Sequence, residues 1–129
     1  MRHGRNTATY WRNRMSSMLE RVAAALSGLK LRDIRIWDFR TFSPLYDYVV
    51  LATGNTERQV AASVRHLFDA LPEIAIKKVE GESEAKWILI DLGDIIVNVM
   101  QKDEREYYQL EKLFIQREEV KIDGLNDQL

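Results

Sequence analysis

Two apolar segments separated by a short acidic turn constrain the fold of this chain more than any other feature. Residues 86–101 read KWILIDLGDIIVNVMQ. Isoleucine, valine and tryptophan favour extended strands, and Asp and Gly are common residues of hairpin turns. The segment therefore predicts an antiparallel hairpin. Because it contains no catalytic nucleophile and no metal-binding cluster, it is suited to packing and to presenting a surface.

Length and composition limit the classes of protein to consider. A chain of 129 residues is long enough for one domain with a single core. The formal net charge of −1 gives no basic field of the kind that non-specific nucleic-acid binding requires. The absence of cysteine excludes a disulfide framework and a thiolate metal site. No apolar run approaches the roughly 20 residues that span a bilayer, so we expect no membrane segment.

Charge and periodicity divide the chain into three parts. Residues 1–15 contain four arginines and no acidic residue, which predicts a basic arm or extension rather than an organelle-targeting peptide. Contact of this arm with RNA stays open as an alternative. Residues 16–116 are predicted to form the domain. Residues 117–129 are polar and lack periodicity, so we expect a frayed tail.

The domain alternates between helical and extended patterns. Apolar spacing of i, i+3 and i+4 predicts a helix from about Met15 to residues 28–30 and a second helix that ends before Pro72. Alternating β-branched and aromatic residues predict strands near residues 33–38, 46–52 and 74–79. With the two hairpin strands, the pattern predicts an α/β (α+β) fold with five strands and flanking helices.

A last helix is expected over residues 104–116. Asp103, with a glutamate three residues later, is predicted to cap its N-terminus. One apolar stripe of this helix is expected to face the core, and it contains Tyr107, Leu110 and Phe114.

The turn from Thr53 to Thr56 admits two interpretations. A glycine-containing turn before a helix can hold an anion at the helix N-terminus. Alternatively, Thr56 and Gln59 form a capping box in which each side chain satisfies a free backbone N–H group. The second interpretation is favoured, because the turn has one glycine and no following lysine. Arg58 on the exposed first turn could then contact a polar partner.

No arrangement of residues in the sequence indicates catalysis. Asp91 and Asp94 suggest Mg²⁺ at first, but their spacing across a turn sends the side chains in different directions. The two histidines, His3 and His66, have no serine and carboxylate at a spacing typical of a triad. We therefore expect no catalytic, cofactor-binding or metal-binding residues, and a protein that is not an enzyme.

Several motifs, in order and spacing, resemble the ribosomal silencing factor family, also called the Iojap family. The matching pieces cover roughly residues 16–114. They comprise Asp47-Tyr48, residues 52–56 with Arg58-Gln59-Val60, Val79-Glu80-Gly81, the hairpin from Trp87 to Met100, and Glu104-Arg105 with Tyr107, Leu110, Glu111, Lys112 and Leu113. One departure is Asn98, where the family usually has histidine, although asparagine can still satisfy a polar contact. The connection over residues 101–103 also differs from the commoner His-Pro-Glu type.

The resemblance implies a mixed five-stranded sheet flanked by helices, like that of nucleotidyltransferases but without their catalytic signature. It also implies a translational repressor that binds large-subunit ribosomal protein fourteen, blocks joining of the small subunit and lowers translation when nutrients are scarce. Trp87 and Leu92 match family positions on the partner surface. Asp91, Asp94, Asn98 and Arg58 complete the set of candidate partner-binding residues.

Other functions stay open at this point. The chain could be a nucleotide-handling enzyme with residual nucleotidyltransferase activity, or a general interaction module that dimerises through the hairpin. It could be a monomer or a homodimer when free, and contact with ribosomal RNA would be incidental. A bacterial cytoplasmic location is expected, with mitochondrion or chloroplast as the alternative.

Overall fold

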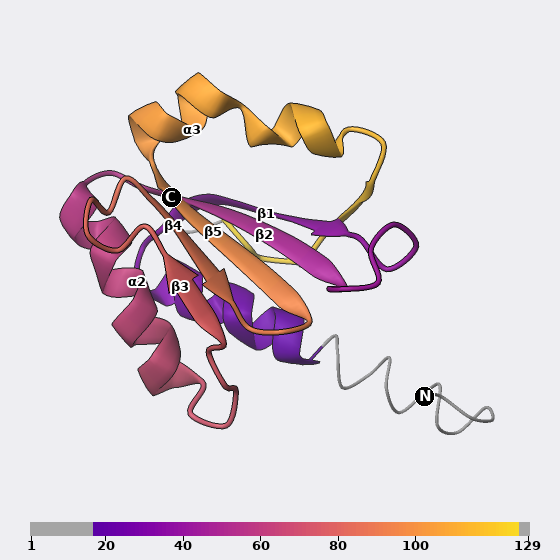
Figure 1. Cartoon of the computed structure of the whole chain (residues 1–129), viewed down its shortest axis with the longest axis horizontal. Helices are drawn as coiled ribbons and strands as arrows, with labels where there is room; N and C mark the ends of the chain where they lie inside the picture. Colours follow the sequence, from indigo (N-terminus) through magenta and orange to yellow (C-terminus); the bar gives the residue numbers. More distant parts are fainter. Residues whose placement is uncertain (1–16, 127–129) are drawn as a thin grey trace.

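The computed structural model describes residues 17–126, which form one mixed sheet covered by helices on both faces (Figure 1). The strand order is β3-β4-β5-β2-β1-β6. A helix over residues 17–28 precedes the first strand. The other elements are β1 (Arg32–Asp38), β2 (Tyr48–Gly54), α2 (Glu57–Ala70), β3 (Lys78–Glu80), β4 (Trp87–Asp91), β5 (Ile95–Gln101), α3 (Lys102–Tyr108), η1 (Leu110–Phe114) and β6 (Glu118–Val120).

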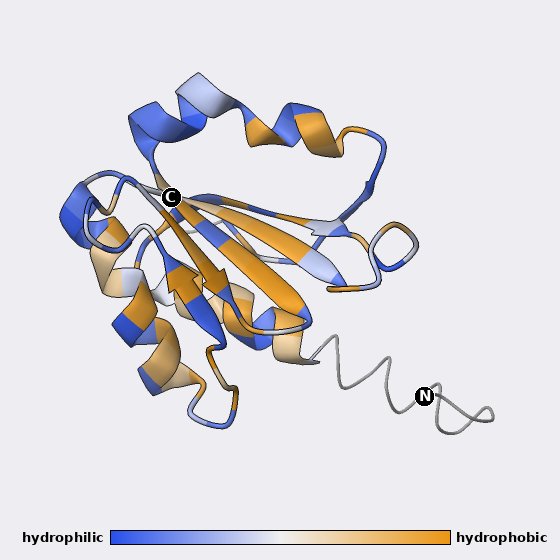
Figure 2. Ribbon diagram, viewed as in Figure 1, coloured by the Kyte–Doolittle hydropathy of each residue, from blue (hydrophilic) through white to orange (hydrophobic). Residues whose placement is uncertain are grey.

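The sheet is antiparallel except at its centre, where β2 and β5 run parallel. These two strands carry the most buried residues, as expected for strands covered on both faces. The helix over residues 17–28 and α2 cover one face, and α3 with η1 lies over the other (Figure 1). Figure 2 shows the hydrophobic residues along β2 and β5 and hydrophilic residues on the outer sides of the helices.

Two hydrophobic clusters follow from the alternation of side chains along the strands. The larger cluster joins the N-terminal helix and α2 to the sheet and includes the fully buried Leu26, Ile36, Ile88, Ile90 and Val97. The smaller cluster lies under η1 and contains Trp37, Phe39, Val49, Leu51 and Met100. None of the helices described between residues 17 and 126 combines the length and hydropathy that crossing a membrane requires.

The capping-box interpretation of the turn before α2 is confirmed. Thr56 Oγ1 accepts from the N–H of Gln59 at 3.1 Å, and Gln59 Oε1 accepts from the N–H of Asn55 at 2.8 Å. Gln59 Nε2 also donates to the carbonyl of Leu29 at 3.1 Å, which ties α2 to the end of the preceding helix. Gly54 is needed for packing, since a Cβ there would lie 2.8 Å from Cγ2 of Val60.

The prediction of five strands is wrong, because the sheet has a sixth strand, β6, in the segment expected to be a frayed tail. β6 pairs antiparallel with β1, and Arg35 donates to both carboxylate oxygens of Glu119, at 3.0 and 2.7 Å. Further along, the side-chain amide of Asn126 forms hydrogen bonds with the backbone N–H and carbonyl of Ile34, at 2.9 and 3.0 Å. The described part of this segment is therefore attached to the sheet edge.

The last predicted helix also differs from the structure. It begins at Lys102, and Gln101, rather than Asp103, caps it through its side chain. It ends at Tyr108, because the next residue, Gln109, has a left-handed φ of 51°, and the chain continues as the short helix η1. Leu110 and Phe114 pack against the smaller cluster, whereas Tyr107 is 79% exposed, so the predicted single apolar stripe does not form. The predicted arm over residues 1–15 lies outside the described residues.

Candidate partner-binding face

The hairpin of β4 and β5 has one sealed side and one partly open side. Ile88 and Ile90 point into the larger core and are fully buried. The side chains that alternate with them point to the opposite face, where Leu89 lies across from Asn98 and Asp91 across from Ile96. We call this the hairpin face and define it by Trp87, Leu89, Asp91, Ile96 and Asn98. All but Asn98 are only partly buried.

Trp87 is half-buried and held in one orientation. Its indole Nε1 donates to Asn98 Oδ1 at 2.9 Å, and its ring packs on Tyr108 with centroids 5.3 Å apart. Asn98 is 5% exposed, so its amide oxygen is committed to this bond. Trp87 therefore presents a rigid aromatic edge that is neither fully in the core nor free to rotate.

Two tyrosines of α3 extend this aromatic surface. Tyr107 is 79% exposed and Tyr108 is 51% exposed, and their rings meet edge to face at 5.0 Å. The prediction that Tyr107 faces the core is wrong. Adjacent residues of a helix point about 100° apart, and Tyr108 is the one whose ring reaches Trp87. The pair Tyr107-Tyr108 was the sequence signal that could have indicated an exposed aromatic surface.

The structure brings together only some of the predicted partner-binding residues. Trp87, Asn98 and Asp91 lie on the hairpin face, where Asp91 also accepts from the N–H of Gly93 at 2.8 Å and so shapes the turn. Leu92 is 7% exposed and packs in the larger core.

Two further candidates lie away from the centre of this face. Asp94 is exposed, and its backbone carbonyl accepts from the N–H groups of Asp47 and Tyr48 at 2.7 and 3.1 Å. Arg58 is exposed on α2, which packs against the opposite face of the sheet. A single flat partner centred on Trp87 would therefore not reach Arg58.

The chemistry of the hairpin face is that of contact rather than reaction. It combines aromatic and aliphatic surface with a rim that includes the ion pair of Lys78 and Glu80, at 3.4 Å. Among residues 17–126, no group of three or more His, Cys, Asp or Glu side chains is placed to hold a metal ion. A fixed tryptophan with aromatic neighbours and a polar rim is typical of a protein-binding surface.

Comparisons with known proteins agree with this description. The family "Ribosomal silencing factor during starvation" matches residues 12–128. The ribosomal silencing factor RsfS of Bacillus subtilis is 44% identical over 100 residues, covering 76% of this chain and 85% of the relative. A more distant relative, mouse "Mitochondrial assembly of ribosomal large subunit protein 1", is 30% identical over 76 residues, covering 55% of this chain and 33% of the relative. A crystal structure of a protein from Bacillus halodurans has a TM-score of 0.73 at 36% identity, covering 83% of this chain and 99% of that one.

The fold and the hairpin face define a small mixed α/β domain with an aromatic contact surface. The family match over residues 12–128 and the sequence identity to the relatives then assign this domain to one family. The chain belongs to the ribosomal silencing factor family, a family of translation regulators that act on the ribosome.

Proposed function

We propose that this protein binds the large ribosomal subunit through the hairpin face, contacts large-subunit ribosomal protein fourteen there, and blocks joining of the small subunit by occupying its docking surface. The outcome would be lower translation under nutrient limitation. The single observation that supports the hairpin face is the fixed, half-exposed Trp87. Family membership and the name of the mouse relative support the large subunit as partner.

Trp87 can be covered by a partner at a low cost in conformational entropy. An aromatic side chain already held by Asn98 and Tyr108 loses little conformational entropy when a partner covers it, and such residues dominate interface energetics. A standard interface buries about 800 Å² on each partner, about a tenth of the accessible surface of 8269 Å².

Leu92 enters this proposal in an indirect role. Because it is 7% exposed, it contributes by holding the hairpin turn against the core rather than by broad contact. Asp91 acts similarly through its bond to the N–H of Gly93.

Co-sedimentation with isolated large subunits tests the proposed surface. Truncation of a hot-spot tryptophan typically costs about 2 kcal/mol or more, so we expect Trp87→Ala to weaken binding about thirtyfold or more. Phe68→Ala is the matched control, because Phe68 is a 55% exposed aromatic residue on α2, on the opposite side of the sheet. Equal binding by the Trp87→Ala variant and the unmodified chain, with the fold intact by circular dichroism, would refute the hairpin face as the contact. Self-association of the chain that competes with subunit binding would instead favour the dimerising alternative.

A further inference from the structure

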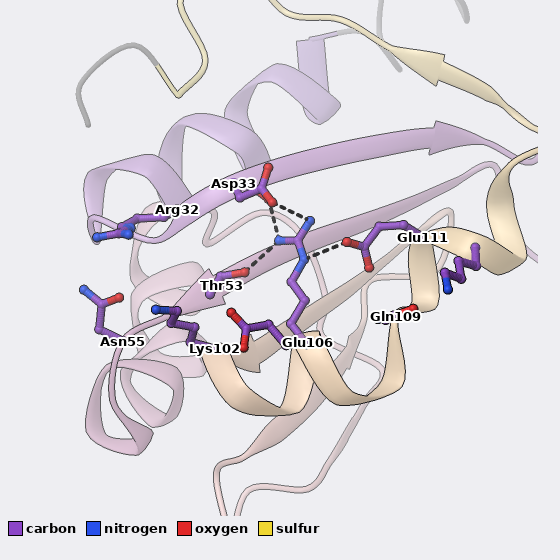
Figure 3. Close-up of a pocket in the computed structure, with 10 residues that line it drawn as sticks. Arg32, Asp33, Thr53, Asn55, Lys102, Glu106, Gln109 and Glu111 are labelled. Carbon is purple, nitrogen blue, oxygen red and sulfur yellow. Dashed lines mark hydrogen bonds and ion pairs between the residues drawn. The ribbon is translucent and has the colours of Figure 1, made fainter.

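A cavity of about 570 Å³, lined by polar and charged residues, lies between α3 and the ends of the central strands (Figure 3). Its wall includes Thr53 near the end of β2, Asn55 just after that strand, Lys102 and Arg105 of α3, and Arg32 at the start of β1. None of the candidate partner-binding residues lines it. Its volume falls in the range of small-molecule sites, about 300–1,000 Å³.

The cavity occupies a special position in the sheet. β2 and β5 are adjacent and parallel, so their carboxyl ends meet at one edge. After β2 the chain enters α2 on one face, whereas after β5 it enters α3 on the other face (Figure 1). A crevice forms where the connections of neighbouring parallel strands diverge in this way, and open α/β sheets bind their ligands at that point.

Arg105 forms the floor of the cavity and is buried, with 5% exposure. Its Nη1 donates to Thr53 Oγ1 at 2.7 Å and to the carbonyl of Asp33, and its Nε donates to Glu111 Oε2 at 3.4 Å. Its Nη2 lies 3.3 Å from Asp33 Oδ2 but makes no hydrogen bond within the described residues. Glu111 Oε1 is likewise buried without a partner there. Buried polar atoms are seldom left in this state, and a bound ligand would satisfy them.

The mouth of the cavity carries an excess of unpaired positive charge. Three basic residues that line the cavity are exposed and form no ion pair within residues 17–126, namely Arg32, Lys102 and Lys112. Only one acidic residue of the lining, Glu106, is likewise exposed and without an ion pair there. Figure 3 shows Arg32, Asn55 and Lys102 at the same end of the cavity. Cationic side chains next to an amide favour a phosphate, to which they donate charge-assisted hydrogen bonds.

We propose that this cavity binds a small phosphorylated metabolite of mononucleotide size. The phosphate lies between Arg32 and Lys102, and the remainder of the ligand extends over Arg105. There Glu106 accepts hydrogen bonds from hydroxyl groups, and Arg105 Nη2 donates one. The site holds a ligand without transforming it, and it is separate from the surface proposed to contact the ribosome.

Titration calorimetry on the full chain tests this site, with AMP and GMP as probes and with adenosine and inorganic phosphate as comparisons. We expect saturable binding of at least one mononucleotide, weakened about tenfold or more by Lys102→Ala and by Arg32→Ala. Both side chains are exposed, so both variants should fold. Arg65→Ala is the control, since Arg65 is an exposed arginine on α2 outside the cavity.

Three results would overturn the proposal. The first is the absence of saturable binding of either mononucleotide. The second is an equal loss of binding in Arg65→Ala, which would indicate non-specific ionic attraction. The third is binding of inorganic phosphate as tight as that of the mononucleotides, which would mean that the cavity selects an anion and not a metabolite.

Discussion

Removal of the Arg105 guanidinium should destabilise this domain more than removal of any exposed arginine. Arg105 comes from α3 and connects it to two strands, through Thr53 on β2 and Asp33 on β1, and also to Glu111 on η1. These contacts hold α3 over the sheet and so keep Tyr108 against Trp87. Arg105→Ala would remove all of them at once.

The magnitude follows from the burial of the groups left behind. Breaking a buried ion pair by removing one partner costs about 3–5 kcal/mol. The Asp33 side chain is 64% exposed, so water can replace its lost contact, whereas the Glu111 side chain is only 27% exposed. We therefore expect a loss at the lower limit, about 3 kcal/mol, out of a folding stability of roughly 5–15 kcal/mol for a domain of this kind.

Urea unfolding followed by tryptophan fluorescence measures this loss. With an m-value near 2 kcal/mol/M, the midpoint should fall by roughly 1.5 M. Arg105→Lys should lose part of this stability, since an ammonium keeps the charge but lacks the planar fork. Arg65→Ala is the control, because its ion pair with Asp69 joins side chains that are 79% and 59% exposed, and exposed pairs contribute little. Unfolding of Arg105→Ala at the same urea concentration as the unmodified chain would refute the connecting role of Arg105.

Two further perturbations test the hairpin face and the β6 edge. Gly81 has a φ of 88° and a Cβ there would lie 2.1 Å from the carbonyl oxygen of Trp87, so Gly81→Ala should cost at least about 2 kcal/mol and reduce subunit binding. Gly124→Ala is the control: Gly124 has a φ of 81° and a Cβ there would have nothing within 4 Å, so this variant should lose only about 1 kcal/mol through backbone strain. Equal falls in melting temperature for Gly81→Ala and Gly124→Ala would contradict a clash between a Cβ at Gly81 and the Trp87 carbonyl. The Arg35 guanidinium holds the pKa of Glu119 at about 2, below its usual 4.5. The ion pair of Arg35 and Glu119 therefore stabilises the fold fully above pH 4.5, and this stabilisation is lost as the pH falls toward 2. Glu119→Gln should thus destabilise by about 1–2 kcal/mol near neutral pH, with the difference from the unmodified chain vanishing in acid; a difference that does not change with pH would argue against the pair.

Local patterns in the sequence predicted the elements whose residues decide their own conformation. The hairpin and α2 were predicted because their apolar spacing, turn residues and capping box lie within a few residues of one another. β6 was missed because Glu118–Val120 is short and polar, and it is a strand only through pairing with β1, which is about 80 residues earlier in the chain.

The candidate site was predicted only in part, for the same reason. Trp87 and Asn98 come from paired strands, so their proximity follows from the hairpin. Leu92 matches a family position on the partner surface, yet its side chain is 7% exposed and packs in the larger core. Arg105 was named only among the residues that match the family, because its partners on β1 and β2 are 72 and 52 residues away and no local pattern indicates them. Contacts at that range depend on the topology of the sheet, which the local pattern does not specify.

A subunit-joining experiment tests whether the chain blocks docking of the small subunit through the hairpin face. Isolated large subunits would be incubated with excess protein before small subunits are added, and joined ribosomes would be measured by light scattering. We predict that the unmodified chain and Phe68→Ala both reduce joining, whereas Trp87→Ala leaves joining near the level without protein. Unchanged joining with the unmodified chain would contradict the proposed block of subunit joining, and equal inhibition by Trp87→Ala would contradict the role of the hairpin face.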